Sequence, residues 1–124
     1  MRPITFLLFI LTFAGNAISQ SHHLTQAEKF IDDYVQKLDG SLSFQNGINT
    51  YIEKPANDTD ALHQGFKTSQ CDLESNGEWE LLFAKDVDID NQTYRAICYE
   101  HFGKMHMAIY RQEKSGKYYF RIWC

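Results

Sequence analysis

Apolar side chains recur at helical spacing near the start of the chain. Between residues 25 and 40 they follow the spacing i, i+3, i+4, i+7, i+8 and i+11, which places them on one face of a helix. The six are Ala27, Phe30, Ile31, Tyr34, Val35 and Leu38. Thr25 and Glu28 match a capping box, and Gly40 stands where helices often end in the left-handed conformation. The pattern predicts an amphipathic helix that begins at Thr25, ends near Gly40 and packs on a sheet.

Residues 42–52 fit two structures. An Asn-Gly dipeptide at 46–47 separates Leu42 and Phe44 from a second stretch of alternating residues, which is typical of a β-hairpin. The same segment also fits one face of a second helix, and the residues on that face are Phe44, Ile48, Tyr51 and Ile52. The turn dipeptide favours the hairpin. Residues 55–65 are polar and rich in turn formers, which predicts a loop.

From Phe66 onward the pattern changes to a period of two, which predicts strands. Residues 79–89 predict one long strand with a bulge near Lys85, and turns are expected at Asn91-Gln92 and Gly103-Lys104. The apolar strand positions after the first turn are Tyr94, Ala96, Cys98, Phe102, Met105, Met107, Ile109, Tyr118, Phe120 and Ile122. These patterns predict an α+β domain in which one N-terminal amphipathic helix packs on a curved antiparallel sheet of four to six strands.

The first nineteen residues have the composition of a secretory signal peptide. Arg2 supplies a positive charge, residues 6–14 form a short apolar run, and residues 17–19 match a small-x-small cleavage site. The apolar run is too short for a membrane span, and no later run is longer. We therefore expect a signal peptide over residues 1–19 and a secreted, extracellular α+β domain over residues 20–124.

If the protein is secreted, its two sequons and three cysteines predict covalent modifications. Asn57 and Asn91 each begin an Asn-x-Thr sequon, so both are expected to carry glycans. Cys71, Cys98 and Cys124 are an odd number of thiols in an oxidising compartment. One disulfide is expected, with three alternative pairings. The remaining thiol is either buried or joins two chains in a disulfide-linked homodimer.

Charge is distributed unevenly along the chain. The net charge is −4 with His neutral, which makes nucleic acid a poor partner. Residues 101–124 are nevertheless basic, with five Lys or Arg against Glu113 alone. This tail is either a surface for an anionic partner, such as a glycan or a lipid headgroup, or a set of strands that lie beside acidic ones. We favour the second interpretation.

A helix, an irregular middle and a curved antiparallel meander together resemble the cystatin-like and NTF2-like folds. The segments most similar to NTF2-like sequences are residues 27–34 and 79–83. True cystatins carry a Gln-x-Val-x-Gly hairpin and two disulfides, and the nearest segment here is Gln45-Asn46-Gly47-Ile48. Enzymatic NTF2-like proteins place a carboxylate and a partner acid or His between helix and sheet, and no residue here matches those by motif. The resemblance therefore implies the fold and leaves cysteine-protease inhibition as an alternative.

Few residues offer catalytic or metal chemistry. A turn at Gly103-Lys104 would place His101 opposite His106, but two ligands are too few for a zinc site. Residues 86–90 begin like a calcium loop but lack its glycine and its bidentate Glu, so an exposed acidic strand face is expected. Neither a metal nor a cofactor is predicted. No nucleophile motif supports an enzyme.

Aromatic residues are concentrated in the last strands, in larger number than one face of a small sheet needs. Both faces are therefore expected to be covered or to contact a ligand. Glu100 shares its predicted face with Met107, where burial would suit its carboxylate to general-base work, although the rim of the sheet is the expected place. The candidate ligand-binding residues are Tyr99, Glu100, Phe102, Met107 and Tyr110.

The leading hypothesis is a secreted, N-glycosylated, non-enzymatic binding module that uses the aromatic side of its sheet. Its expected partner is an extracellular protein or a small apolar ligand. The alternatives are a carrier of a small apolar ligand in a helix–sheet pocket, a cystatin-like protease inhibitor, and a hydrolase or isomerase built around Glu100.

Overall fold

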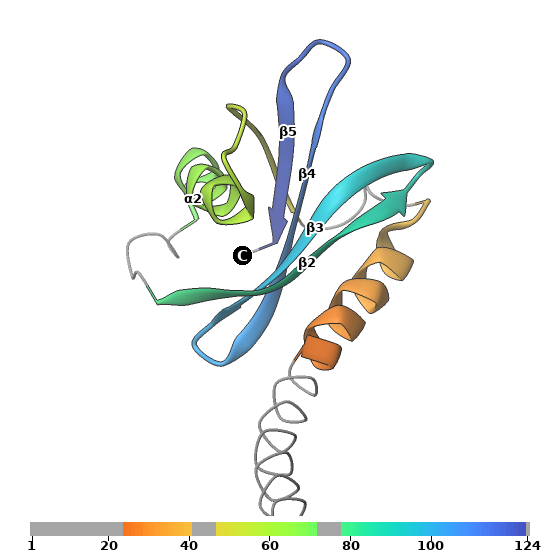
Figure 1. Ribbon diagram of the computed structural model, residues 1–124, viewed down its shortest axis with the longest axis vertical. Helices are drawn as coiled ribbons and strands as arrows, with labels where there is room; N and C mark the ends of the chain where they lie inside the picture. Colours follow the sequence, from red (N-terminus) through yellow and green to blue (C-terminus); the bar gives the residue numbers. More distant parts are fainter. Residues whose placement is uncertain (1–23, 41–46, 72–77, 124) are drawn as a thin grey trace, which may run out of the picture.

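The chain forms an α+β structure around one five-stranded antiparallel sheet (Figure 1). The computed structural model describes residues 24–40, 47–71 and 78–123. The strands are β1 (Ile48–Ile52), β2 (Trp79–Ile89), β3 (Gln92–His101), β4 (Lys104–Gln112) and β5 (Tyr118–Trp123), in the order β1-β5-β4-β3-β2. The strand count and the antiparallel pairing agree with the prediction. The predicted signal peptide and Cys124 lie outside the described residues.

Residues 24–38 are helical, and the predicted apolar stripe faces the sheet. Ala27, Ile31 and Leu38 are fully buried there. On the polar side, the Lys85 ammonium of β2 lies 3.0 Å from the Glu28 carboxylate and 2.7 Å from that of Asp32. The predicted start is wrong, because Leu24 and Thr25 are already helical and Thr25 therefore lies within the helix rather than at its N-cap.

The end of this helix is fixed to the turn between β2 and β3. Gly40 has a φ of +79°, the left-handed conformation that its position predicted. Its backbone N–H donates to the Asp90 carboxylate, while the Asp90 N–H donates to Asp39 Oδ1 at 3.0 Å. The two reciprocal contacts hold the helix end at the edge of the sheet.

A second helix, α2 (Asp58–Ser69), replaces the loop predicted over residues 55–65 and continues past the point where strands were expected to begin. Asn57 caps it, because its side chain accepts from the Asp60 N–H at 2.8 Å. Five of its twelve residues are buried, including Leu62 and Phe66. At Gly65 an added Cβ would lie 2.1 Å from the ring of Phe120, so the glycine allows close contact with β5.

The two helices lie on opposite faces of the sheet (Figure 1), which corrects the expected single helical layer. Against α2 the core contains Ile97, Tyr99, Ala108, Phe120 and Ile122. Against the helix of residues 24–38 it contains Ala96, Cys98, Met107, Ile109 and Trp123. Consecutive strand residues alternate between the two faces. This is why the last strands are apolar and aromatic at both parities.

Three details of the predicted strands are wrong. The bulge in β2 lies between Leu81 and Phe83 rather than near Lys85, so Trp79 and Leu81 face α2 instead of sharing a face with Phe83. The turns are Asp90-Asn91 and Phe102-Gly103, each one residue earlier than predicted. The second shift removes Phe102 from the strand face and leaves it 65% exposed in the turn.

Of the hairpin predicted over residues 42–52, the described part is a strand, and the hairpin pairing itself stays a prediction. Residues 48–52 form β1, which excludes a second helix there, and β1 pairs with β5. Leu42 and Phe44, its expected first strand, lie outside the described residues. Within the described ranges no helix is both long and apolar enough to cross a membrane.

Candidate binding surface

A row of tyrosine and arginine side chains crosses the sheet on the face that carries the helix of residues 24–38. Tyr51 of β1 pairs with Tyr119 of β5, and Tyr119 pairs with Arg111 of β4. The Arg111 guanidinium carbon lies 5.6 Å from the centre of the Tyr94 ring on β3. We call Tyr51, Tyr119, Arg111 and Tyr94 the tyrosine row. Because adjacent strands are 4.7–4.9 Å apart, it spans about 14 Å across four strands.

The rings of the row contact one another edge to face. The Tyr119 ring centre lies 6.3 Å from those of both Tyr51 and Tyr94, with interplanar angles of 77° and 61°. The Tyr119 hydroxyl donates to Asn49 Oδ1 at 2.6 Å. Exposure rises along the row, from 5% at Tyr94 to 52% at Tyr51. The row is therefore anchored at β3 and open to solvent at β1.

Basic side chains accompany these rings. The Lys117 ammonium lies 5.6 Å from the centre of the Tyr51 ring, as Arg111 does from Tyr94. Buried Arg121, two residues after Tyr119 on β5, donates to Asn49. The ion pairs within the described ranges use Lys29, Lys85 and Arg95, and none uses Arg111 or Lys117. These two cations of the basic tail therefore have no carboxylate partner among the described residues.

The chemistry of the row suits recognition. Burial raises the pKa of Tyr94, and the neighbouring Arg111 opposes that rise. Its hydroxyl is therefore protonated near neutral pH. Phenolic hydroxyls, guanidinium N–H groups and ring faces can bind an anionic or hydroxyl-rich partner.

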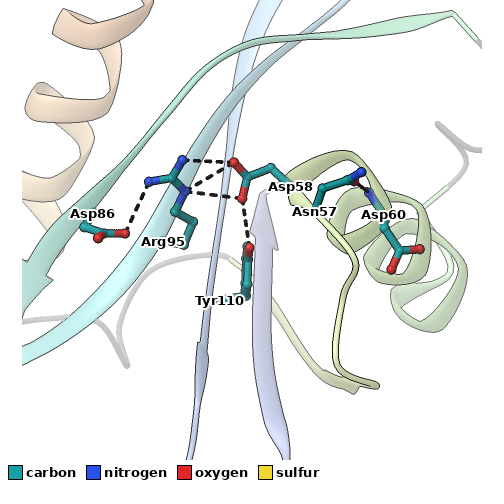
Figure 2. A network of polar contacts seen from close by, with 6 residues as sticks. All are labelled: Asn57, Asp58, Asp60, Asp86, Arg95 and Tyr110. Carbon is teal, nitrogen blue, oxygen red and sulfur yellow. Dashed lines mark hydrogen bonds and ion pairs between the residues drawn. The ribbon is translucent and has the colours of Figure 1, made fainter.

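A second polar cluster lies on the opposite face (Figure 2). Asp58, the first residue of α2, accepts from Arg95 Nη2 at 3.1 Å and from the Tyr110 hydroxyl at 2.8 Å. Arg95 also contacts Asp86 Oδ1 at 3.3 Å. Burial and the bond to Asp58 raise the pKa of Tyr110. Because the Asp58 carboxylate already accepts from both neighbours, the cluster joins α2 to the sheet and offers no unoccupied base.

The candidate ligand-binding residues from the sequence do not come together. Tyr99 and Tyr110 face α2, whereas Glu100 and Met107 point to the opposite face. Phe102 lies in the β3–β4 turn. Glu100 is half-buried between its strand partners Glu80 and Met105. The shifted turn and the alternation of faces separate these five positions.

The predicted pair His101 and His106 is also displaced. His101 pairs with Lys104, and His106 with Tyr99, so the imidazoles are diagonal neighbours with centroids 6.3 Å apart. His106 stacks on Tyr99 at 5.3 Å, and burial, His101 and Lys104 lower its pKa. Among the described residues no group of three His, Cys, Asp or Glu side chains is placed to hold a metal.

The structure reduces the number of possible disulfide pairings. Cys98 is a free thiol, fully buried against the helix of residues 24–38, and burial raises its pKa to about 12. Cys71 is buried on the α2 face and is not free. The two pairings that involve Cys98 are therefore wrong.

Sequence reasoning missed the tyrosine row as a unit. Tyr94 is among the predicted strand positions and Tyr119 belongs to the aromatic residues of the last strands, but Tyr51 lies in the ambiguous segment and Arg111 in the basic tail. The one local signal is the alternation of Tyr119 and Arg121 along β5. The partnership of β1 with β5 completes the row.

The chain matches no protein-family model, and comparisons with curated proteins and with solved structures give no significant match.

Proposed function

We propose that this protein is a secreted, N-glycosylated, non-enzymatic binding module whose tyrosine row contacts an anionic extracellular partner. The observation that carries this proposal is the placement of Arg111 and Lys117 beside tyrosine rings, without an ion pair in the described part of the chain. An arginine without a carboxylate partner beside a partly exposed aromatic row is complementary to an anionic ligand.

The packing of the sheet favours a surface contact over an internal ligand. Tyr99 and Phe120 are fully buried on one face, and Met107 and Ile109 on the other. A carrier would hold its ligand where these side chains pack between helix and sheet. Glu100, on which an enzyme was considered, lies half-buried near the end of β3. The tyrosine row, by contrast, becomes more exposed toward β1.

The sequon positions support the glycosylated part of the proposal. Asn57 is exposed immediately before α2, and its capping bond uses the side-chain oxygen, which leaves the amide nitrogen for a glycan. Asn91 is exposed in the β2–β3 turn with a φ of 65°. Both acceptors therefore meet solvent, as N-glycosylation requires.

We further propose an intramolecular disulfide between Cys71 and Cys124. Three cysteines are present, Cys98 is free, and Cys71 is not free. Because Cys71 is disulfide-bonded within the single chain, this leaves Cys124 as its partner in an oxidising compartment.

Binding to three anionic probes tests the function: a heparin-derived hexasaccharide, a poly-glutamate peptide and phosphatidylserine vesicles, each at about 150 mM salt. Arg111→Gln is compared with Lys104→Gln at the start of β4, and Tyr51→Ala with Phe102→Ala in the β3–β4 turn. We expect at least one probe to bind, with each row variant about fivefold weaker and the controls within about twofold. Binding to no probe, or equal effects of row and control variants, would overturn the proposal. Circular dichroism confirms that each variant is folded.

A further inference from the structure

A cleft lies beside the tyrosine row, on the α2 side of edge strand β1. Its volume is about 690 Å³, and it is bounded by β1, the last turns of α2 and the residue before β5. Tyr51 and Lys117 both line this cleft. Tyr51 belongs to the tyrosine row, and the Lys117 ammonium contacts its ring. The cleft and the row therefore form one continuous surface around β1.

The walls of the cleft carry two lysines from different elements. Lys67 comes from the last turn of α2 and Lys117 from the residue before β5. Neither ammonium takes part in an ion pair within the described ranges. Glu53 is the one carboxylate among the lining residues. The lining thus has a small excess of positive charge that faces solvent.

Hydrogen bonds fix the shape of this cleft. The Glu53 N–H donates to Gln64 Oε1 at 2.8 Å, and Gln64 Nε2 donates back to the Glu53 carbonyl at 3.3 Å. The Thr68 hydroxyl donates to the Gln64 carbonyl at 2.9 Å, so its oxygen remains able to accept a bond from a ligand hydroxyl. The wall formed by α2 is therefore held against β1, and a ligand would meet a site with little freedom left to lose.

We propose that the cleft and the tyrosine row together bind one linear acidic glycan, with an anionic group of the glycan between Lys67 and Lys117. This inference rests on the proposed function and names its ligand class. Tyr51 is 52% exposed at the junction and offers a ring face for a sugar ring. The row then continues past Arg111 to Tyr94, about 14 Å from Tyr51, a length that suits a chain of several sugar units.

A glycan fits this surface better than an acidic peptide does. Protein interfaces depend on apolar anchors that become fully buried. The exposed side chains of the lining are Tyr51, Glu53, Lys67, Thr68 and Lys117. Apart from the tyrosine ring they present hydroxyl, ammonium and carboxylate groups rather than apolar anchors. The anionic group of the glycan is a sulfate or a sugar carboxylate, and both share the chemistry that two lysines recognise.

Isothermal titration calorimetry of the full mature glycoprotein tests the inference. The probes are a heparin-derived hexasaccharide, which carries sulfates, a hyaluronan hexasaccharide, which carries carboxylates alone, and a poly-glutamate peptide. Lys67→Gln and Lys117→Gln are compared with Lys114→Gln, the same charge change in the β4–β5 turn but outside the cleft lining. We expect about fivefold weaker glycan binding for each cleft variant and a change within about twofold for the control.

The outcomes separate this inference from the proposed function. If glycan binding requires Arg111 but neither Lys67 nor Lys117, the cleft is not part of the binding site, and the proposed function still stands. If only poly-glutamate binds, and Arg111→Gln weakens that binding, the ligand is not a glycan, but the partner of the row is still anionic. Binding of none of these probes or of the vesicles would overturn both. If the cleft variants weaken binding, preference for the heparin-derived probe identifies sulfate and equal binding of hyaluronan identifies carboxylate.

Discussion

The Asp58 carboxylate at the start of α2 accepts from the Arg95 guanidinium of β3, 37 residues later in the chain (Figure 2). Nε and Nη2 of Arg95 both contact it, at 3.2 and 3.1 Å from Oδ2. Because α2 forms one wall of the proposed cleft, this pair fixes the cleft indirectly through the orientation of the helix.

Replacing Arg95 with methionine is expected to reduce the free energy of unfolding by about 1–2 kcal/mol, because Asp58 is left partly buried without the two N–H donors of Arg95. Asp86→Asn, which removes only the exposed side of the network, should change it by less than about 0.5 kcal/mol. Urea denaturation of both variants measures the difference. Equal effects of the two substitutions would show that the α2 contact contributes no special stability.

Gly65→Ala is expected to destabilise the fold by about 1–3 kcal/mol, although alanine is the better helix former. The added Cβ would lie 2.1 Å from the Phe120 ring. Lys67→Ala on the exposed last turn of α2 is the control. Thermal denaturation should give a lower midpoint for Gly65→Ala alone, and a midpoint raised by this variant would contradict the close contact of α2 with β5.

His106 is expected to make the fold less stable in mild acid. Its folded pKa lies below the usual value of 6.5. The unfolded chain therefore binds the proton more readily, and the contribution to stability that is complete above 6.5 is lost as the pH falls through the folded pKa. Urea midpoints at pH 7.5 and pH 5 should differ less in His106→Gln than in the wild type, since carboxylate titration is common to both. An identical pH dependence would contradict this assignment.

Iodoacetamide labelling tests the cysteine assignment. At pH 8 the folded, unreduced protein should take no label, because Cys98 is buried and a pKa of about 12 leaves little thiolate. Denaturation without reductant should add one label at Cys98, and reduction should add two more. A dimer on a non-reducing gel would assign the proposed disulfide to two chains. More than one label before reduction would contradict a bridge between Cys71 and Cys124.

The strands and the first helix were predictable because long periodic segments dominate them. In the first helix, the inward-facing residues repeat at helical spacing and are buried as expected; they are Ala27, Ile31 and Leu38. Helix α2 was missed because its polar residues outnumber its buried ones. The capping pair Asn57 and Asp60 was the local signal that could have revealed it.

The binding surface could not be predicted because it depends on a long-range pairing. Tyr51 meets Tyr119 only when β1 lies antiparallel beside β5, and no local pattern specifies that partner. The turn at Phe102-Gly103 could not be predicted from the local pattern either. Phe102 takes a positive φ of 52°, which is uncommon for a bulky residue, and a one-residue shift moves it from the strand face to the turn.

Nuclear magnetic resonance of the protein with ring-labelled tyrosines tests the central claim most directly. The chain has seven tyrosines, of which Tyr51, Tyr94 and Tyr119 form the row, whereas Tyr99 and Tyr110 face α2. Titration with the heparin-derived hexasaccharide should shift the ring signals of Tyr51 and Tyr119 most and leave that of Tyr99 in place. Shifts confined to Tyr99 and Tyr110, or no shifts at saturating glycan, would contradict the tyrosine row as the contact surface.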